Sequence, residues 1–510
     1  MSNARARLVV GTLGGLVGGE IRRTVGLRAS SSADDFVGSD KQAQRARAIR
    51  QGMEDLGPLY IKVGQMLSTR PDICPEYLMT EFENLHAKVS VSPFTDFEPV
   101  LEDELGGDWK RYFRDIDTEP IGCASLAQVY KVQLKSGKNA VVKIQRPGVR
   151  QDMLEDMALL GKVVRRLAKR MPDLNEVLDL EAMLDVVFTS MRPELDFTLE
   201  GENMDDFRDR VADFDTLKIP EVLFATPRVL VQGLAKGKSI RDFDKTKLTP
   251  EQCETIGREL LAFMFWGFFV DRKFHADPHP GNVFISDDGE ANIIDWGMVG
   301  QVDLNLAMSL IVVLLSMGMG DGTTLARSWI EMGRATKRAD IGGFVGDMGR
   351  FVPGIAGQSL ERFNFGVQLS AILKYSTKRG IATSPMIAIL GKAFANVEGS
   401  IRYLAPELSI TDVFEDEFKS IAQELARAAL GKEAMARQAA QAFLMAFQGP
   451  GQVRSILADM ANRDTTMRLG EDMGMRSRHE DRADARARAW RRAALAAGGA
   501  AYLMERKRRG

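Results

Sequence analysis

The spacing of two aspartates and one asparagine near the middle of the chain constrains its fold and chemistry most. Asp277 and Asn282 stand in the pattern D-x-x-x-x-N inside the segment Phe274–Ile285, and an Asp-Trp-Gly triplet that begins at Asp295 follows 13 residues after the asparagine. Short apolar runs flank the turn between them, which predicts a hairpin that brings Asn282 and Asp295 onto adjacent strands. Two hard oxygen ligands suit Mg²⁺, which takes its other ligands from water and phosphate. The pattern therefore predicts that Asn282 and Asp295 bind Mg²⁺ and that Asp277 orients the nucleophile of a phosphoryl transfer.

The same segment carries two histidines that could suggest a different metal site. His275 and His279 are four residues apart, but Pro278 and Pro280 disfavour a helix that would bring them onto one face. We therefore interpret both histidines as structural. The alternative for the whole segment is a turn-rich loop whose Asp and Asn cap the neighbouring backbone. The Asp-Trp-Gly triplet at the expected distance argues against that alternative.

A lysine on a predicted strand supplies the second chemical signal. The run Ala140–Ile144 places apolar residues around Lys143, and a turn rich in Lys, Ser, Gly and Asn separates it from the apolar run Leu126–Leu134. This arrangement predicts a β-hairpin. Its second strand is similar to the V-A-I-K strand of protein kinases, whose lysine contacts the phosphates of ATP. Glu200, on a helix predicted to begin near Pro193, is the candidate partner carboxylate of Lys143.

Several features of ordinary protein kinases are missing. No G-x-G-x-x-G loop precedes Lys143, and its place is taken by a loop that contains Gly122, Cys123, Ala124 and Ser125. Ala276 fills the position of the Arg in H-R-D, so the usual arginine link to an activation-loop phosphate cannot form. No A-P-E sequence follows the Asp-Trp-Gly triplet. These departures count against an authentic protein kinase, which is kept as an alternative.

Together the motifs resemble those of the UbiB-like atypical kinases (the aarF/ADCK group) over about residues 50–300. The resemblance is carried by four separated segments in order: Lys62-Val63-Gly64-Gln65, the loop 121–129, Glu194-Leu195-Asp196 and His275–Asn282. It implies that the Ala-rich loop replaces the Gly-rich loop and holds the nucleotide. The chain departs from the family at Cys123, where Ala is frequent, and at Gly233, where an acidic residue is common.

The resemblance also implies a regulatory lid over the active site. Lys62 and Gln65 are three residues apart and so lie on one face of a helix. In the family pattern this helix covers the site, and its lysine meets the acidic residues Glu194 and Asp196. A lid there occupies the space of a protein substrate, so we expect little protein kinase activity in trans.

The function implied is that of an atypical kinase or ATPase that binds Mg–ATP and supports isoprenoid quinone (ubiquinone-like) or related lipid biosynthesis. Its partners would be ATP and an isoprenoid lipid or quinone precursor. A second hypothesis is a non-enzymatic, ATP-gated protein that binds lipids or recruits biosynthetic enzymes. The sequence does not indicate the phosphoryl acceptor and leaves homo-oligomerisation open.

We predict an α+β, two-lobed, protein-kinase-like fold with an added N-terminal helical lid and a mostly helical C-terminal extension. Helices are expected over 150–210 and 300–430, and further strands at 216–219 and 228–231. The charge-free run Leu304–Gly320 spans 17 residues, at the short edge for a membrane span, and is predicted to be a buried helix. The predicted regions are a basic Gly-rich segment at 1–49, a helical lid at 50–115, a small lobe at 116–235, a helical large lobe at 236–430 and an Ala/Arg-rich tail at 431–510.

Composition narrows the classes of partner. A formal net charge of −2 over 510 residues gives no support for a nucleic-acid-binding protein. Three widely spaced cysteines exclude a disulfide framework and suit a reducing compartment. The stretch Arg476–Arg509 holds eleven basic against four acidic residues and suits an anionic membrane surface, with a solvated tail as the alternative. We expect a cytoplasmic protein, or a mitochondrial one if the source is eukaryotic, with membrane association left open.

Overall fold

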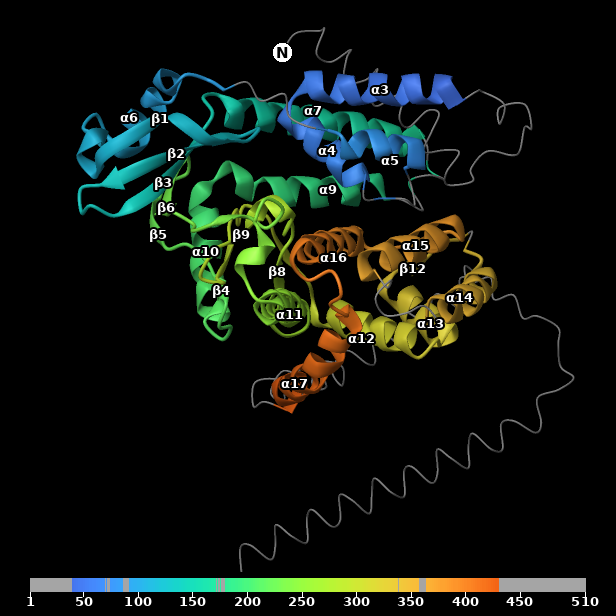
Figure 1. The fold of residues 1–510 in the computed structure, drawn as a ribbon. Coiled ribbons are helices and arrows are strands. Elements are labelled where there is room, and N and C mark those ends of the chain that lie inside the picture. The colour runs from blue at the N-terminus through green and yellow to red at the C-terminus, as the bar shows by residue number, and fades with distance from the viewer. Residues whose placement is uncertain are drawn as a thin grey trace, which may run out of the picture. The chain divides into compact units, whose positions relative to one another are not determined.

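The computed structural model describes residues 39–68, 70, 74–85, 91–170, 172, 175, 179–337, 339–356 and 364–430. The chain divides into two compact units, Met1–Arg427 and Ala428–Gly510, and all elements that carry the site belong to the first (Figure 1). The basic stretch before residue 39 and the predicted tail from residue 431, with its membrane-binding stretch, lie outside the described residues.

An N-terminal layer of helices carries the K-x-G-Q motif. It consists of α3 (Ser39–Leu56), α4 (Pro58–Ser68) and α5 (Glu76–Glu83), which share a buried apolar cluster with α7 (Val149–Arg170) and α9 (Leu180–Met191) (Figure 1). A Cβ at Gly64 would collide with the Leu85 side chain and come within 2.8 Å of Met53 Sδ. Glycine at this position therefore allows α4, which carries the K-x-G-Q motif, to pack closely against Leu85 and Met53.

The small lobe is a five-stranded antiparallel sheet of order β1-β2-β3-β6-β5. Its strands are β1 (Phe113–Cys123), β2 (Ala127–Leu134), β3 (Asn139–Gln145), β6 (Val229–Gly233) and β5 (Val222–Ala225). The short helix α6 (Glu98–Leu105) shares an apolar cluster with the sheet, and α10 (Phe197–Val211) contacts β5 and β6. The predicted hairpin is present as β2 and β3. The expected helical region up to residue 115 is wrong at its end, because β1 already begins at Phe113.

The predicted catalytic segment, Phe274–Ile285, lies at the start of the large lobe. Helix α11 (Pro250–Trp266) begins with a reciprocal capping box between Thr249 and Gln252, and it passes into a π-turn at Gly267–Asp271. Arg272 then adopts φ +57°, which turns the chain into the next strand. This strand is β8 (Lys273–His275), which pairs with β11 (Val299–Gln301). A separate sheet has the strand order β4-β10-β9-β7. Its strands are β4 (Leu217–Lys218), β10 (Ala291–Ile293), β9 (Val283–Ile285) and β7 (Lys238–Ser239).

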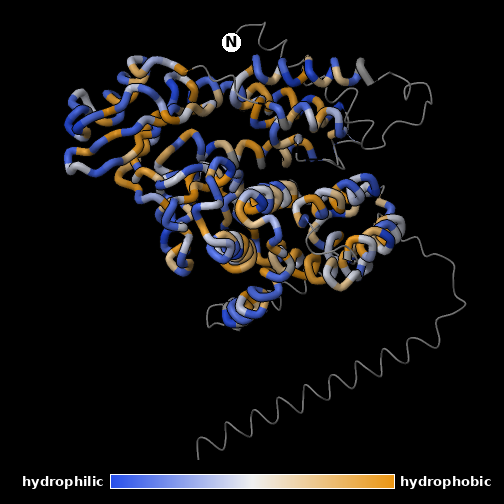
Figure 2. Tube along the Cα trace, in the orientation of Figure 1, coloured by the Kyte–Doolittle hydropathy of each residue, from blue (hydrophilic) through white to orange (hydrophobic). Residues whose placement is uncertain are grey.

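Six helices complete the described part of the large lobe. They are α12 (Leu304–Gly318), α13 (Gly322–Met332), α14 (Ile341–Ala356), α15 (Phe365–Lys378), α16 (Pro385–Leu404) and α17 (Ile410–Leu430), with a short strand pair β12 (Arg334–Ala335) and β13 (Ile381–Ala382). Helix α12 is the charge-free run, and it contributes several residues to the main apolar core (Figure 2). None of the described helices is both long and apolar enough to cross a membrane.

One carboxylate of this lobe is buried without a counter-ion in contact. Glu398 on α16 accepts a hydrogen bond from the backbone N–H of Phe365 at 2.9 Å through Oε1, while its Oε2 is buried and has no partner among the described residues. Burial raises the pKa of Glu398 to about 8, although the backbone N–H of Phe365 and the charge of Arg402 oppose it. Near neutral pH the folded protein therefore holds a proton here.

We expect this proton to make the stability of the protein depend on pH. An unfolded glutamate titrates near 4.3, so the stabilisation is complete below that pH and is lost as pH rises through about 8, with a slope of up to about 1.4 kcal/mol per pH unit. Glu398→Gln should flatten the fall of the melting temperature between pH 5.5 and 8. Glu415→Gln, at an exposed position on α17, should keep the wild-type slope. An unchanged slope in Glu398→Gln would show that the carboxylate is ionised when folded.

Candidate active site

Three charged side chains from three separate elements meet at the junction of the lobes. Lys143 on β3 lies 2.9 and 2.8 Å from the two carboxylate oxygens of Glu200 on α10, and 3.3 Å from Oδ1 of Asp295 after β10. The ammonium group also sits over the ring of Phe197, 5.1 Å from its centroid. The strand, the helix and the hairpin predicted from the sequence thus place these three residues together.

The protonation states of this cluster follow from burial and charge. Burial alone would lower the pKa of Lys143, but Asp295 and Glu200 outweigh it, so the pKa of the lysine is raised. Lys143 in turn lowers the pKa of Asp295, against the effect of burial. Burial dominates at Glu200 and raises the pKa of that carboxyl despite Lys143. At neutral pH the site therefore presents a fixed cation beside a fixed carboxylate.

The Asp-Trp-Gly triplet is held in an unusual backbone conformation. Asp295 has φ +61°, a left-handed conformation that is uncommon outside glycine and that Asp tolerates better than most residues. Trp296 anchors the turn in the core, because its side chain is fully buried and its indole N–H donates to the carbonyl of Ile293 at 3.1 Å. Asn203 on α10 donates to the Trp296 carbonyl at 3.1 Å. These contacts aim the Asp295 carboxylate at Lys143.

The two histidines of the catalytic segment hold its backbone. Nδ1 of His275 accepts a hydrogen bond from the backbone N–H of Asp277 at 3.1 Å, and Nε2 lies 3.3 Å from the Ile294 carbonyl. The ring therefore carries its proton on Nε2, and burial lowers its pKa and keeps it neutral. Nδ1 of His279 accepts from the N–H of Gly281 at 3.0 Å. Both histidines thus contact the backbone of the segment, in line with their interpretation as structural residues.

Asn282 and Asp295 offer a donor set that fits Mg²⁺. The Asn282 side-chain NH₂ donates to the carbonyl of Asp277 at 3.0 Å, which leaves its amide oxygen for another ligand. Its backbone carbonyl accepts from the N–H of Ile294 at 2.9 Å, so the asparagine lies beside the start of the triplet. In the described residues no cluster of three or more His, Cys, Asp or Glu could hold an ion by itself. A magnesium ion here would depend on phosphate oxygens for its remaining ligands.

The Ala-rich loop lies level with Lys143 across the sheet. Gly122 on β1 pairs with Val129 on β2, which pairs with Lys143 on β3. Cys123 is the last residue of β1 and an exposed free thiol, and Ala124 and Ser125 follow it in the connection to β2. A Cβ at Gly122 would meet Val129 at 3.8 Å, which is ordinary van der Waals contact. The register of the three strands thus places the start of the loop on the same level of the sheet as Lys143.

The lid residues have three different sets of contacts. Lys62 Nζ lies 2.8 Å from Oε1 of Glu194, which belongs to the 3-10 turn Pro193–Leu195 before α10. Gln65 donates instead to the backbone carbonyl of Leu85 at 3.1 Å, within the lid. Asp196 is the N-cap of α10 and accepts from the backbone N–H of Thr198 at 3.2 Å. The lysine of the motif therefore meets one of the two expected acidic residues, while the other starts the helix that carries Glu200.

Lys62 also lies within the field of the catalytic carboxylates. Burial alone would lower its pKa, but Glu194 and Asp277, with a smaller contribution from Asp295, outweigh burial and raise it. The lid thus brings a positive charge toward the residues predicted to handle phosphate.

Sequence reasoning missed three residues of α16 that touch the catalytic segment. Asn396 donates to Oδ1 of Asp277 at 2.6 Å, and Lys392 Nζ lies 3.2 Å from the same oxygen. Ser400 donates to the carbonyl of Pro278 at 3.0 Å. They lie more than 100 positions after the segment in no recognised motif, and their four-residue spacing on one helix face is the one signal that groups them.

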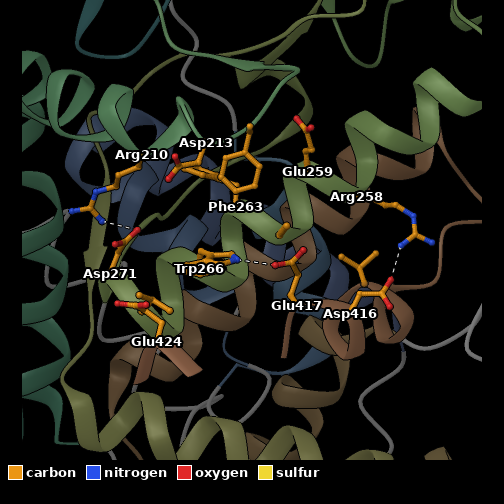
Figure 3. Close-up of a pocket in the computed structure, with 14 residues that line it drawn as sticks. Arg210, Asp213, Arg258, Glu259, Phe263, Trp266, Asp271, Asp416, Glu417 and Glu424 are labelled. Atoms are coloured by element: carbon orange, nitrogen blue, oxygen red, sulfur yellow. Dashed lines mark hydrogen bonds and ion pairs between the residues drawn. The ribbon is translucent and has the colours of Figure 1, made fainter. Parts of the chain in front are cut away.

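A separate cavity of 540 Å³ lies beside α11 and α17 (Figure 3). Its wall combines Phe263 and Trp266 with a set of acidic side chains, and the Trp266 indole N–H donates to Glu417 at 2.8 Å. None of the predicted site residues lines it. This cavity is therefore separate from the cluster of Lys143, Glu200 and Asp295 at the lobe junction.

Comparison with known proteins identifies the family. The family described as ABC1 atypical kinase-like domain matches residues 84–328. A protein from Azotobacter vinelandii named probable protein kinase UbiB is 30% identical over 374 residues, which cover 72% of this chain and 69% of that protein. A Vibrio cholerae protein of the same name is 28% identical over 369 residues, 71% and 68% of the two chains. An uncharacterized protein from the hydrogenase 1 5′ region of Clostridium pasteurianum is 30% identical over 379 residues, 74% and 71%. With its kinase-like α+β fold, the chain belongs to the UbiB-like family of atypical kinases.

Proposed function

We propose that the protein is an atypical kinase or ATPase that binds Mg–ATP at the junction of its lobes. The convergence of Lys143, Glu200 and Asp295 carries the proposal, since it joins a buried cation to a carboxylate suited to metal–phosphate binding. In this scheme Lys143 binds the α- and β-phosphates and the loop Gly122–Ser125 covers them. Asn282 and Asp295 hold the metal ion, which would neutralise charge on the phosphates. Asp277 orients the acceptor oxygen for in-line attack.

The same geometry favours a small acceptor or water over a protein substrate. The Lys62–Glu194 ion pair ties the lid to the turn before α10, next to the catalytic carboxylates. Ala276 is buried and supplies no side chain to bind an activation-loop phosphate. We therefore propose weak or no phosphorylation of proteins in trans.

The family resemblance supports a role in the biosynthesis of an isoprenoid quinone or a related lipid. An isoprenoid lipid or quinone precursor is the proposed partner besides ATP. Contact with a membrane surface through the basic C-terminal stretch, in the cytoplasm or in a mitochondrion, is proposed from the sequence. A direct assay of phosphate transfer from ATP would identify the phosphoryl acceptor.

A titration with ATP tests the nucleotide site. A ligand at 100 times its Kd stabilises the folded state by about 2.7 kcal/mol. We expect ATP to raise the melting temperature of the wild type more with Mg²⁺ than without it. Asp295→Asn should lose the Mg²⁺-dependent part, because the amide removes the charge that binds the ion.

Asp288→Asn is the matched control for this titration, because Asp288 is an exposed residue of the turn between β9 and β10. It should respond to Mg–ATP as the wild type does. A wild type that is folded but shows no ATP-dependent shift would contradict the proposal. So would an Asp295→Asn variant with an unchanged Mg²⁺ effect.

A further inference from the structure

Helix α16 presents a line of polar side chains to the catalytic segment. Lys392, Asn396 and Ser400 are spaced by four residues, which places them on one face of the helix. Each contacts Asp277 or the residue after it. The helix contacts the turn Pro280–Asn282 and strand β11, which pairs with β8, so this face points at the region where Asp277 acts.

The contacts on Asp277 converge on one of its two oxygens. Asn396 donates to Oδ1 at 2.6 Å, and the ammonium group of Lys392 lies 3.2 Å from Oδ1. Hydrogen bonds to an ionised acceptor are shorter and stronger than neutral ones. With Oδ1 engaged by two donors, Oδ2 is the oxygen that an acceptor hydroxyl or water can approach. The helix thereby fixes the rotation of the carboxylate as well as its position.

Helix α16 is itself firmly held in the core. Phe394 stacks on Phe268 of the π-turn, with ring centroids 4.4 Å apart and an interplanar angle of 26°. A Cβ at Gly257 of α11 would come within 3.1 Å of Ile401, so α11 and α16 pack closely. A polar face on such a helix can hold a carboxylate at little further entropic cost, because the backbone that carries it is already ordered.

The catalytic segment has no lysine or arginine of its own. The residues from Phe274 to Ile285 include His279 but no stronger cation. A phosphoryl transfer develops negative charge beside the catalytic carboxylate and needs positive charge placed in advance. The nearby cations come from outside the segment, namely Lys392 on α16 and Lys62 on α4.

We propose that α16 is part of the catalytic site, with Asn396 and Lys392 as positioning residues that hold Oδ1 of Asp277 and leave Oδ2 to the acceptor. This inference rests on the proposed function. In the step it serves, the acceptor oxygen forms a bond to the γ-phosphorus while the bond from that phosphorus to the β,γ-bridging oxygen breaks. The electron pair of the broken bond leaves with ADP, and the acceptor proton passes to Oδ2 of Asp277 and then to solvent.

The test is the steady-state turnover of ATP by the full chain, measured as release of ADP, with kcat and the KM for ATP determined separately. We expect Lys392→Met to lower kcat by about tenfold to a hundredfold, with little change in the KM for ATP. Lys392→Arg should recover most of the lost kcat, because it keeps the charge beside Oδ1 of Asp277. Asn396→Leu should lower kcat by about tenfold or more, again with little change in KM. Lys374→Met, an identical change at an exposed site on α15, should match the wild type.

The outcomes separate this inference from the proposed function. Wild-type protein that neither binds nor turns over ATP overturns the proposed function, and the inference with it. Wild-type turnover with an unchanged kcat in Lys392→Met and Asn396→Leu overturns the inference alone. A higher kcat in Lys392→Met would also overturn it, because the lysine would then block Asp277. Lower melting temperatures with a kcat equal to that of the wild type would show that the helix has a purely structural role.

Discussion

Asp277→Asn is expected to lower ATP turnover by about 10²–10⁴-fold and to leave the affinity for Mg–ATP nearly unchanged. The asparagine can keep its Oδ1 in place, since Asn396 donates to that oxygen in the wild type. Its NH₂ group would replace Oδ2, however, and cannot accept a proton from the acceptor. The residues proposed to bind the nucleotide and metal are untouched. Turnover is measured as ADP release, and affinity as the shift of melting temperature with ATP.

This variant decides between an enzyme and an ATP-gated binding protein. If complementation of the biological function survives in Asp277→Asn while turnover is lost, then ATP binding suffices and the non-enzymatic hypothesis is favoured. If the wild type and the variant release ADP at equal rates, then Asp277 does not serve the reaction. Asp303→Asn, at the N-cap of α12 and outside the site, is a suitable control for the same chemical change.

The second large effect is expected for Lys143→Met, which should both destabilise the fold and abolish nucleotide binding. Glu200 is almost fully buried, with a side-chain exposure of 2%, and Lys143 contacts both of its oxygens. Breaking a buried ion pair from one side costs about 3–5 kcal/mol, because it leaves a buried charge without its partner. The thermal midpoint should fall, and Mg–ATP should no longer raise it. Chemical denaturation of the wild type and the variant measures the loss.

The penalty should depend on pH in a direction that identifies its cause. Burial already raises the pKa of Glu200 in the wild type, and the loss of Lys143 raises it further. A carboxyl with a raised pKa contributes stability that is present below its unfolded pKa, near 4.3, and is lost as pH rises through the folded pKa. Lys143→Met should therefore be less destabilised at pH 5 than at pH 8. The double variant Lys143→Met/Glu200→Gln should recover part of the loss, and a double variant as unstable as the single one would contradict a buried-charge penalty.

The sequence was sufficient for the family and for the kinase-like α+β fold because its signals are local. The hairpin that carries Lys143 appears as β2 and β3, and the hairpin between Asn282 and Asp295 appears as β9 and β10. In each case apolar runs and a turn lie within a few residues of one another. The charge-free run at 304 is a helix that contributes to the core, as its length and composition predicted.

Two strands of the small-lobe sheet, β1 and β5, were missed, each for its own reason. β1 holds acidic residues and Pro120, and it lies at the edge of the sheet, where one side of the strand needs no partner. β5 has four residues, too few to show an alternating pattern. Both are strands because the central part of the sheet pairs with them. Tertiary pairing, which no short window contains, decided their structure.

The contacts of the site were harder to foresee than its residues. Asp196 was grouped with Glu194 as an acidic pair, but Asp is also one of the favoured N-cap residues, and in the structure Asp196 caps α10. Lys392 and Asn396 could not be tied to Asp277 from the sequence, since α16 follows after more than 100 residues. A motif search groups residues that are close in the chain, and it has no means of finding a helix that returns to the site.

The late position of α16 in the sequence has a consequence for the protein during its synthesis on the ribosome. Chains emerge from the N-terminus, and the Asn396–Asp277 hydrogen bond joins residues 119 positions apart. The residues proposed to bind phosphate and metal are all synthesised before α16; they are Lys143, Glu200, Asn282 and Asp295. A nascent chain therefore contains these residues before it contains the helix that holds Asp277. Under the proposed mechanism, such a chain could retain a nucleotide and gain full turnover only when synthesis has passed residue 396. The protein would thus be protected from consuming ATP while it is unfinished.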